Sequence, residues 1–578
     1  MKRHLIGDCK SSYFAAKYFI IFFILLCNAH TLQASWAEDT LKQMTLREKI
    51  GQLFVVAAAS CLEQPEEQLA TLIVSSPYNV RPDYIQKMVT DYHVGGLLLL
   101  YKSTPAQQVE FINQYQKIAS IPLCIFQDCE WGLNMRLYDT VYFPKNMTLG
   151  AIQNNTLLYE LGFEIGKQCA AVGVHMNLAP VIDINYNPFN PVIFDRSFGQ
   201  DKNIVAEKAL YIMRGMQDAG ILTCAKHFPG HGDTTVDSHV DLPTIYHDAT
   251  RLHSIELYPF RKIINEGCNA VMTAHICIPS FEQIPHVPAS LSRALVTDVL
   301  QHTLGFKGLI ITDGMGMEAI IKYRDSAHAA LEAFMAGNDI ILACPDIPAA
   351  VQLFEEAVND KRIDIKDLNG RVLKILKVKE SIHLNKQPVL STYNLHEQLH
   401  NPYSIELKKR LFQEAITIVK GHEYIPLNMN NIGLLQIGGN QQNMCMEILR
   451  RQHHCTALHV PSHMTHEQMQ SARDQLKDKD LIIVSISDIN KYAQRQFGIS
   501  DVTIELLDNC TSAGKKIVIV IFGNPYCLRY FLNCNAIIMA YEDVPEAQEA
   551  AALVLLGTHK ATGKLPITIV ENKKQWKS

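Results

Sequence analysis

The sequence predicts an α/β protein of two domains, a (β/α)8 TIM barrel followed by a smaller α/β sandwich domain. Two observations carry this prediction. Short apolar runs alternate with longer amphipathic segments between residues 51 and 343, and a second alternation follows a polar break at residues 385–403. The length of 578 residues suits two large domains, because a single hydrophobic core stops growing beyond roughly 250–300 residues.

Eight apolar runs in the first alternation indicate buried strands. They lie at residues 51–57, 95–101, 122–127, 174–180, 221–226, 270–275, 308–312 and 338–343. Continuous apolar strands of this kind are typical of a parallel sheet that helices cover on both faces.

Helical patterns separate these runs, as a parallel sheet requires. Examples lie at residues 106–117, 156–171, 204–219, 250–266 and 291–303. Eight strand–helix units fit a closed barrel. A doubly wound open sheet is the structural alternative.

The break at residues 385–403 is polar and contains Pro388 and Pro402, which favours a linker or a wrapping segment. Beyond it, strands are predicted at residues 432–437, 481–486, 516–522 and 536–541, and helices at 444–452 and 545–556. The predicted division is a leader over 1–35, a barrel over 36–384, a linker over 385–404 and the sandwich domain over 405–578.

The first 35 residues have the order of an export signal. Basic residues from Lys2 to Lys17 precede an apolar run at residues 18–27, and a cleavage site is expected after Ala34 or Ser35. The run is shorter than the roughly twenty residues that a membrane-spanning helix needs. We expect an exported protein, periplasmic or extracellular, with an uncleaved N-terminal anchor as the alternative.

Composition narrows the class of partner. A hydrophobic content of 48% and a charged content of 19% describe a globular chain. The net charge of −5 gives no basic footprint for nucleic acid, and we expect no membrane contact beyond a possible N-terminal anchor. The 15 cysteines lack the spacing of a disulfide framework or a zinc knuckle. Nothing in the sequence indicates an oligomeric state.

Polar residues follow most of the predicted barrel strands. In a parallel barrel, reactive groups lie just after the strands, at the C-terminal face. In this chain the polar residues at the strand ends are Asp128, Glu130 and Arg136 after the third strand, Asp183 and Arg196 after the fourth, Lys226 and His227 at the fifth, His275 at the sixth and Asp313 after the seventh. So many polar groups on one rim predict a pocket.

The longest signature is KHFPGHGDTTVDSHVDLP at residues 226–243. This segment resembles the hallmark loop of glycoside hydrolase family 3 β-N-acetylglucosaminidases. The resemblance extends to ITDGMGM at residues 311–317 and, in the C-terminal part, to the α/β sandwich domain of two-domain members. It implies an acid/base dyad of Asp237 and His239, and Asp313 as nucleophile.

Two departures from the family pattern stand out. Members often have Asp or Ala after the nucleophile, whereas Gly314 stands here. Many relatives have Asp-x-Glu-Gly-Gly after the third strand, whereas residues 128–132 are DCEWG. Because of the second departure, the contacts that the segment after the third strand makes with the leaving group are expected to differ from those of many relatives.

The chemistry of such a site can be argued from its residue types. A retaining glycosidase needs a carboxylate to attack the anomeric carbon and an acid to protonate the leaving oxygen. Asp313 can supply the first. His239 can supply the second, because an imidazole with an ordinary pKa of about 6.5 exchanges protons near neutral pH. Asp237 would fix the tautomer of His239 and stabilise the imidazolium.

Sugar hydroxyls and an acetamide need dense, fixed donors and acceptors. The resemblance implies that the terminal N-acetylglucosamine is bound by Asp128, Arg196, Lys226 and His227. From their strand-end positions we add Arg136 and His275 as substrate-binding candidates. Ion pairs within the rim are the alternative role for Arg196 and Lys226.

A zinc site and a serine hydrolase fit the signature loop less well. A zinc site could use Asp237 with His227, His231 and His239, but Pro229 and Gly230 break the helical spacing that such a site needs. A serine hydrolase could use Ser238, but the chain has no Gly-x-Ser-x-Gly elbow there. We therefore expect no metal and no organic cofactor.

The expected function is an exported retaining β-N-acetylhexosaminidase acting on terminal β-linked N-acetylglucosamine. Peptidoglycan fragments as substrate follow from the resemblance and the leader alone. A phosphorylase stays open, since a histidine acting as base is uncharged and would not repel phosphate. A β-glucosidase of the same family and a sugar-binding cell-wall module without turnover stay open as well. The second domain is expected to be structural or to shape the substrate entrance.

Overall fold

The computed structural model describes residues 35–61, 78–386, 389–429, 431–439, 443–455 and 457–569. The predicted leader lies outside the described residues except for Ser35. No helix in the described ranges is both long enough and apolar enough to cross a bilayer.

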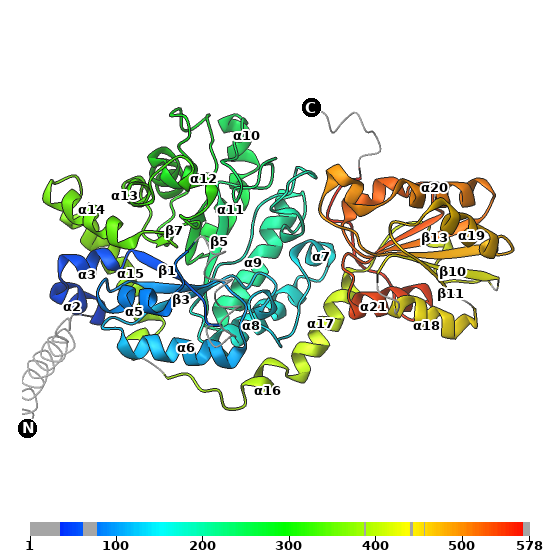
Figure 1. Ribbon diagram of the computed structural model, residues 1–578, viewed down its shortest axis with the longest axis horizontal. Coiled ribbons are helices and arrows are strands. Elements are labelled where there is room, and N and C mark those ends of the chain that lie inside the picture. Colours follow the sequence, from blue (N-terminus) through cyan, green and yellow to red (C-terminus); the bar gives the residue numbers. More distant parts are fainter. Residues whose placement is uncertain are drawn as a thin grey trace, which may run out of the picture.

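The first domain is the predicted barrel (Figure 1). Its parallel strands are β1 (Phe54–Ala58), β2 (Gly96–Leu99), β3 (Cys124–Gln127), β4 (Met176–Asn177), β5 (Leu222–Phe228), β6 (Ala270–Thr273), β7 (Leu309–Thr312) and β8 (Ile341–Leu342). They pair in the order β7-β6-β5-β4-β3-β2-β1-β8. The Ile340 N–H donates to Ile310 O and the Thr312 N–H to Ile340 O, both at 3.0 Å, so β7 and β8 meet. The barrel prediction is confirmed, and an open sheet is excluded.

Helices surround the strands. They are α2 (Trp36–Gln43), α3 (Leu46–Gly51), α5 (Pro82–Thr90), α6 (Pro105–Ile118), α7 (Asn146–Ala151), α8 (Thr156–Ala171), α9 (Lys202–Asp218), α10 (Ala249–Ser254), α11 (Leu257–Asn265), a π-helix at Ala294–Thr303, α12 (Glu318–Ile321), α13 (Ser326–Ala336), α14 (Ile347–Asn359) and α15 (Ile365–Ser381). The helix predicted at residues 250–266 is divided in two. Pro259 explains the division, because a proline ring clashes with the carbonyl four residues earlier, here that of Ile255.

The second domain is a six-stranded sheet in the order β11-β10-β12-β13-β14-β9. Its strands are β9 (Thr417–Lys420), β10 (Ile432–Ile437), β11 (Ala457–Val460), β12 (Leu481–Ile486), β13 (Lys516–Ile521) and β14 (Ala536–Met539). Only β9 runs antiparallel to its neighbour. The sequence pattern missed β9 and β11, the two edge strands, which are only partly buried and lack a continuous apolar run.

Helices cover both faces of this sheet (Figure 1). The helices α18 (Met444–His453) and α21 (Pro545–Leu555) share one hydrophobic cluster with the strands. The helices α19 (His466–Leu476) and α20 (Asp501–Ser512) contribute to another. The predicted α/β sandwich is therefore confirmed.

A connector and a partly buried carboxylate are among the contacts that join the two domains. The connector carries α16 (Leu395–Leu399) and α17 (Pro402–Ala415), and α17 packs on α7 and α8 of the barrel and on α21. Glu542, just after β14, accepts hydrogen bonds from the hydroxyls of Tyr142 and Thr148 and from the Lys145 N–H of the barrel. The predicted domain limits at 384 and 405 stay predictions.

A lysine is buried at the foot of the barrel. Lys379 of α15 is 1% exposed, and its Nζ donates to Gln52 Oε1 at 2.7 Å. Burial lowers the pKa of Lys379 to about 7. An unfolded lysine titrates near ~10.4, so between these values the unfolded chain binds more protons than the folded chain. The cost of this burial is fully present below about pH 7 and fades as the pH rises.

We therefore expect Lys379→Met to raise the free energy of unfolding at pH 6 by more than about 1 kcal/mol and to flatten its rise between pH 7 and 10. Urea denaturation at several pH values measures both effects. Lys366→Met, on the exposed face of the same helix, is the control and should keep the wild-type pH dependence. A wild-type slope in Lys379→Met would contradict the assignment.

Candidate active site

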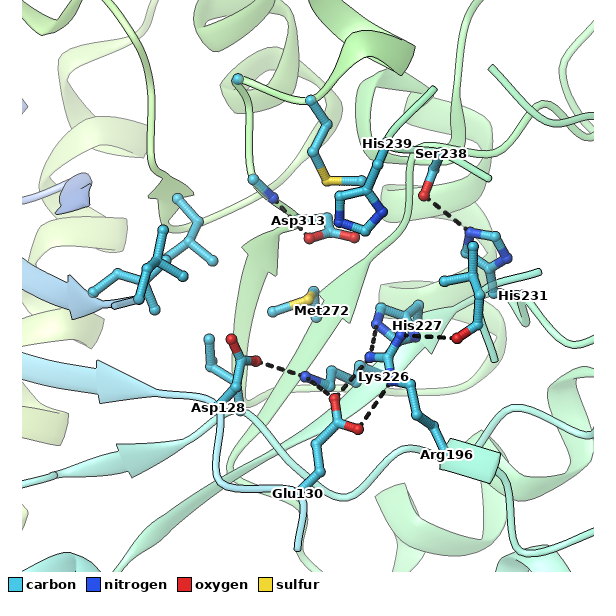
Figure 2. Close-up of a pocket in the computed structure, with 18 of the residues that line it drawn as sticks. Asp128, Glu130, Arg196, Lys226, His227, His231, Ser238, His239, Met272 and Asp313 are labelled. Atoms are coloured by element: carbon cyan, nitrogen blue, oxygen red, sulfur yellow. Dashed lines mark hydrogen bonds and ion pairs between the residues drawn. The ribbon is translucent and has the colours of Figure 1, made fainter. Parts of the chain in front are cut away.

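A cavity of about 610 Å³ opens at the carboxyl ends of the barrel strands (Figure 2). Its apolar floor includes Leu98 of β2, Met272 of β6 and Leu342 of β8. Charged side chains and imidazoles form the rest of the wall. Most of the strand-end residues predicted to form a pocket therefore surround one space, whereas Asp183 and His275 do not line it.

Lys226 of β5 is the centre of a buried charge network (Figure 2). Its side chain is 2% exposed, and Nζ lies 2.8 Å from Asp128 Oδ1 and 2.9 Å from Glu130 Oε1. Arg136 binds the other oxygen of Asp128 at 2.7 Å. Arg196 holds Glu130 in a bidentate pair, with distances of 2.9 and 2.7 Å. Both carboxylates that follow β3 are thus fixed by cations, Lys226 from β5, Arg196 from the segment after β4 and Arg136 from their own segment.

The network keeps both carboxylates ionised. Burial alone would raise the pKa of Glu130, but the Arg196 guanidinium and the Lys226 ammonium outweigh burial and lower it to about 2. For Asp128, Lys226 and Arg136 likewise overcome burial and lower the pKa. The pKa of Lys226 is raised, because its two carboxylates overcome the burial that would lower it.

Two histidines of the signature segment are held by a buried aspartate. Asp183, which follows β4, accepts from His227 Nδ1 at 2.7 Å and from the His231 N–H at 2.6 Å. Nε2 of His227 then lies 3.3 Å from Nη2 of Arg196. Burial lowers the pKa of His231 to about 4, and its ring contacts the hydroxyls of Thr234 and Ser238. His231 thereby anchors the loop that follows.

Asp313 lies directly after β7 and lines the cavity. The Gly314 N–H donates to its Oδ1 at 2.8 Å. Burial would raise the pKa of Asp313, but His227, His275 and the bond from Gly314 outweigh it, so the pKa lies below its usual value. A carboxylate facing the cavity is therefore present at neutral pH.

The turn after Asp313 leaves little room for side chains beyond glycine. A Cβ on Gly314 would lie 2.7 Å from the Tyr78 hydroxyl, and one on Gly316 would lie 2.4 Å from the Tyr78 ring. The packing of Tyr78 explains why Gly314 stands where members of the resembled family often have a larger residue.

His275 supports the same turn from behind. It is fully buried, and its Nε2 donates to Gly314 O at 3.0 Å, so Nδ1 accepts from the Ser290 hydroxyl at 2.8 Å. Burial lowers the pKa of His275, which favours the neutral ring. His275 is not among the residues that line the cavity.

Asp237 and His239 lie on the loop after β5 and form a pair. Asp237 Oδ1 accepts from His239 Nδ1 at 2.8 Å and from the His239 N–H at 2.9 Å. The His239 side chain is 64% exposed and lines the cavity, where Figure 2 draws its ring beside Asp313. The hydrogen bond from Asp237 raises the pKa of His239 against the effect of burial, and Asp313 raises it further.

The predicted site residues are largely brought together. Asp128, Arg136, Arg196, Lys226, His227, His239 and Asp313 line the cavity, whereas Asp237 and His275 stand behind lining residues. Sequence reasoning placed Glu130 on the rim without a binding role, considered His231 only as a zinc ligand and did not single out Tyr78, and all three line the cavity. A binding role for Glu130 could have been inferred, because it follows Asp128 by two residues after the same strand.

The donor atoms of the hypothetical zinc site do not converge on one point. Nδ1 of His227 faces Asp183, Nδ1 of His239 faces Asp237, and both nitrogens of His231 face hydroxyls. Among the described residues, groups with metal-ligand spacing are Asp139 with His396 and His400, and Asp233 with His247 and Glu256. None of these residues lines the cavity.

Comparison with known proteins matches both parts of the chain to domains of one family. The glycosyl hydrolase family 3 N-terminal domain matches residues 45–378, and the C-terminal domain of that family matches residues 293–578. A beta-hexosaminidase A of Pseudoalteromonas piscicida is 29% identical over 84% of this chain and 91% of its own length. A beta-hexosaminidase of Nitrosomonas eutropha is 34% identical over 45% of this chain and 76% of its own length.

Solved structures agree with the fold. A glycoside hydrolase family 3 beta-N-acetylglucosaminidase from a Paenibacillus species aligns with a TM-score of 0.74 at 29% identity. The alignment covers 92% of this chain and 100% of that one. The similarity therefore includes both domains.

The charge network yields a stability prediction. Glu130→Gln removes the counter-charge of two buried cations, so the free energy of unfolding should fall by about 3–5 kcal/mol. Thermal or denaturant unfolding at pH 7 measures the loss. Glu355→Gln is the matched control, because Glu355 forms a bidentate pair with Arg47 on the surface. That change should cost less than about 1 kcal/mol. Equal losses in the two variants would show that burial of the network does not matter.

Proposed function

Since this chain belongs to glycosyl hydrolase family 3, we propose that it is a retaining β-N-acetylhexosaminidase that releases terminal β-linked N-acetylglucosamine. Two kinds of finding support this activity. The relatives at 29% and 34% identity bear the name beta-hexosaminidase, and the Paenibacillus structure is a beta-N-acetylglucosaminidase.

One observation carries the mechanism. The same cavity holds Asp313, whose pKa is lowered, and His239, whose pKa is raised. Near neutral pH this pairing supplies an anionic nucleophile and an acid in one space. These are the two groups that double displacement at an anomeric carbon requires.

The first step forms a covalent intermediate. A carboxylate oxygen of Asp313 attacks the anomeric carbon while Nε2 of His239 gives its proton to the glycosidic oxygen, and the bond from that carbon to the leaving group breaks. Nδ1 of His239 is held by Asp237, so Nε2 is the nitrogen left for proton transfer. Asp237 stabilises the imidazolium before transfer and fixes the tautomer afterwards.

The second step reverses the roles. Neutral His239 takes a proton from water, the resulting oxygen nucleophile attacks the anomeric carbon, and the bond to Asp313 breaks. The sugar leaves with retained configuration, and both residues regain their starting protonation.

The buried network is proposed to bind the sugar. Asp128 offers carboxylate oxygens, while Lys226 and Arg196 offer N–H donors along the same wall. Because each of these groups is already held by an ionic partner, little ordering is left for the substrate to impose. Arg136 and His227 complete the polar wall, and His275 would act through the Gly314 turn.

The natural substrate is proposed to be peptidoglycan fragments, met after export to the periplasm or the cell exterior. This proposal rests on the leader expected from residues 1–35 and on the resemblance of the signature loop.

Catalytic roles can be tested by release of a chromogenic aglycone from a β-N-acetylglucosaminide. Asp313→Asn should lower kcat/KM at least about 1,000-fold, and His239→Ala about 100- to 10,000-fold. His328→Ala is the matched control, because His328 forms the same kind of pair with Asp325 on the surface. Turnover in Asp313→Asn equal to that of wild type would refute the mechanism.

The acceptor can be tested in the same assay. Neutral His239 would not repel phosphate, so phosphorolysis is the competing outcome. Hydrolysis predicts free N-acetylglucosamine and a rate independent of added phosphate. Formation of the sugar 1-phosphate would replace the hydrolase assignment by a phosphorylase.

The pH dependence of kcat/KM tests the dyad separately. His239 must be protonated to act as acid, so activity should be full below its raised pKa and fall as the pH rises through it. Asp237→Asn removes the anionic partner that raises this pKa, so the alkaline limb should move to lower pH. An unmoved limb would mean that another group sets it.

A further inference from the structure

A second cavity, of about 370 Å³, lies between the two domains. Its wall includes Lys145 and Phe194 of the barrel and Phe522, Asn524 and Asp543, which follow β13 and β14. In open parallel α/β sheets, ligands bind in the crevice outside the carboxyl ends of the strands. The cavity occupies that position in the second domain, and its size lies within the range of small-molecule sites.

Asn524 lines this cavity and holds an unpartnered donor. The residue is 4% exposed, and its Oδ1 accepts from the Tyr526 N–H at 2.9 Å, which fixes the orientation of the amide. Within the described part of the chain, its Nδ2 has no hydrogen-bond partner. A buried donor left unpaired costs about 1–3 kcal/mol. A ligand oxygen would remove this cost.

The charges around the cavity disfavour an anionic ligand. Lys145 is paired with Asp195 at 2.6 Å, so its charge is already balanced. Three more carboxyl groups line the wall, those of Asp488, Asp543 and Glu542, although both oxygens of Glu542 already accept from the barrel and burial raises its pKa. A ligand that donates hydroxyl hydrogens would suit these acceptors, whereas a phosphate or carboxylate would be repelled.

Aromatic side chains supply the apolar part of the wall. Phe194, Phe522 and Tyr541 line it and are each less than 10% exposed. Sugar rings combine apolar C–H faces with hydroxyl edges, and aromatic rings beside polar groups suit that combination.

We propose that this interdomain cavity is a second saccharide-binding site, which takes a neutral mono- or disaccharide. The acetamide or hydroxyl oxygen of the sugar would accept from Asn524 Nδ2. Its hydroxyls would donate to the carboxylates of the second domain.

The second site is distinct from the barrel cavity but linked to it. Phe194 and Asp195 line the interdomain cavity, and the next residue, Arg196, lines the barrel cavity. All three form one turn of 3-10 helix. The proposal does not depend on hydrolysis in the barrel, because it rests on the lining of the interdomain cavity alone.

The test is hydrogen exchange of the full chain titrated with N-acetylglucosamine. We expect saturable protection at residues 522–525 and 541–544. N-acetylglucosamine 6-phosphate, the same sugar with an anionic group, should require at least a tenfold higher concentration there. Failure of the proposed function would appear separately, as missing protection at residues 226–239. No protection at 522–525 and 541–544 with saturating N-acetylglucosamine would overturn the second site.

Asn524→Asp sharpens the test, because it is isosteric and keeps the oxygen that accepts from Tyr526 while removing the donor. Protection at residues 522–525 should require at least a tenfold higher sugar concentration. Asn443→Asp is the matched control, since Asn443 also caps a helix through Oδ1, has a buried unpartnered Nδ2 and lies outside the cavity. It should titrate as wild type. If Asn524→Asp does not fold, Asp543→Asn provides the test. It should weaken the binding of N-acetylglucosamine to the interdomain cavity at least threefold. Unchanged titration in the folded variants would overturn the proposal.

Discussion

The contact of Lys226 with Asp128 and Glu130 is the interaction on which the site depends. It joins the end of β5 to the segment after β3, and Glu130 in turn fixes the position of the Arg196 side chain through a hydrogen bond. An ion pair in water would do little to fix geometry. Here Lys226 and Glu130 are buried and their partners are mostly so, and loss of Glu130 would leave Arg196 without its bidentate partner. The polar wall is therefore positioned before a sugar arrives.

The predicted acid stands in a different environment from the predicted nucleophile. Asp313 is attached to a strand end, and its turn is fixed by Tyr78 and His275. His239 is on an exposed loop, held at its base by the contact of His231 with Ser238. This division suits the proposed chemistry. The nucleophile must keep its distance to the anomeric carbon, whereas the proton donor must also admit an acceptor in the second step.

The sequence predicts the fold well where burial of a strand requires its residues to be apolar. All eight barrel strands were found, because strands covered on both faces are continuously apolar. The edge strand β11 contains the exposed His459 and gives no such signal. Within the site, strand-end position identified Lys226 and Asp313, yet it could not tell that the His275 ring turns away toward Gly314 O. Nor could it reveal that Tyr78, far away in the chain, leaves little room for a side chain at position 314. Such features are set by tertiary packing between distant segments.

The second domain reaches the site as well as supporting the barrel. Lys491, in the segment after β12, donates from Nζ to Pro191 O of the barrel at 3.0 Å, next to the cavity-lining Val192. Burial would raise the pKa of Asp237, but its hydrogen bonds to His239 lower it, and the charge of Lys491 lowers it further. An ionised Asp237 is what raises the pKa of His239. The charge of Lys491 thus favours the ionised form of Asp237, which links the second domain to the proposed dyad as well as to the stability of the barrel.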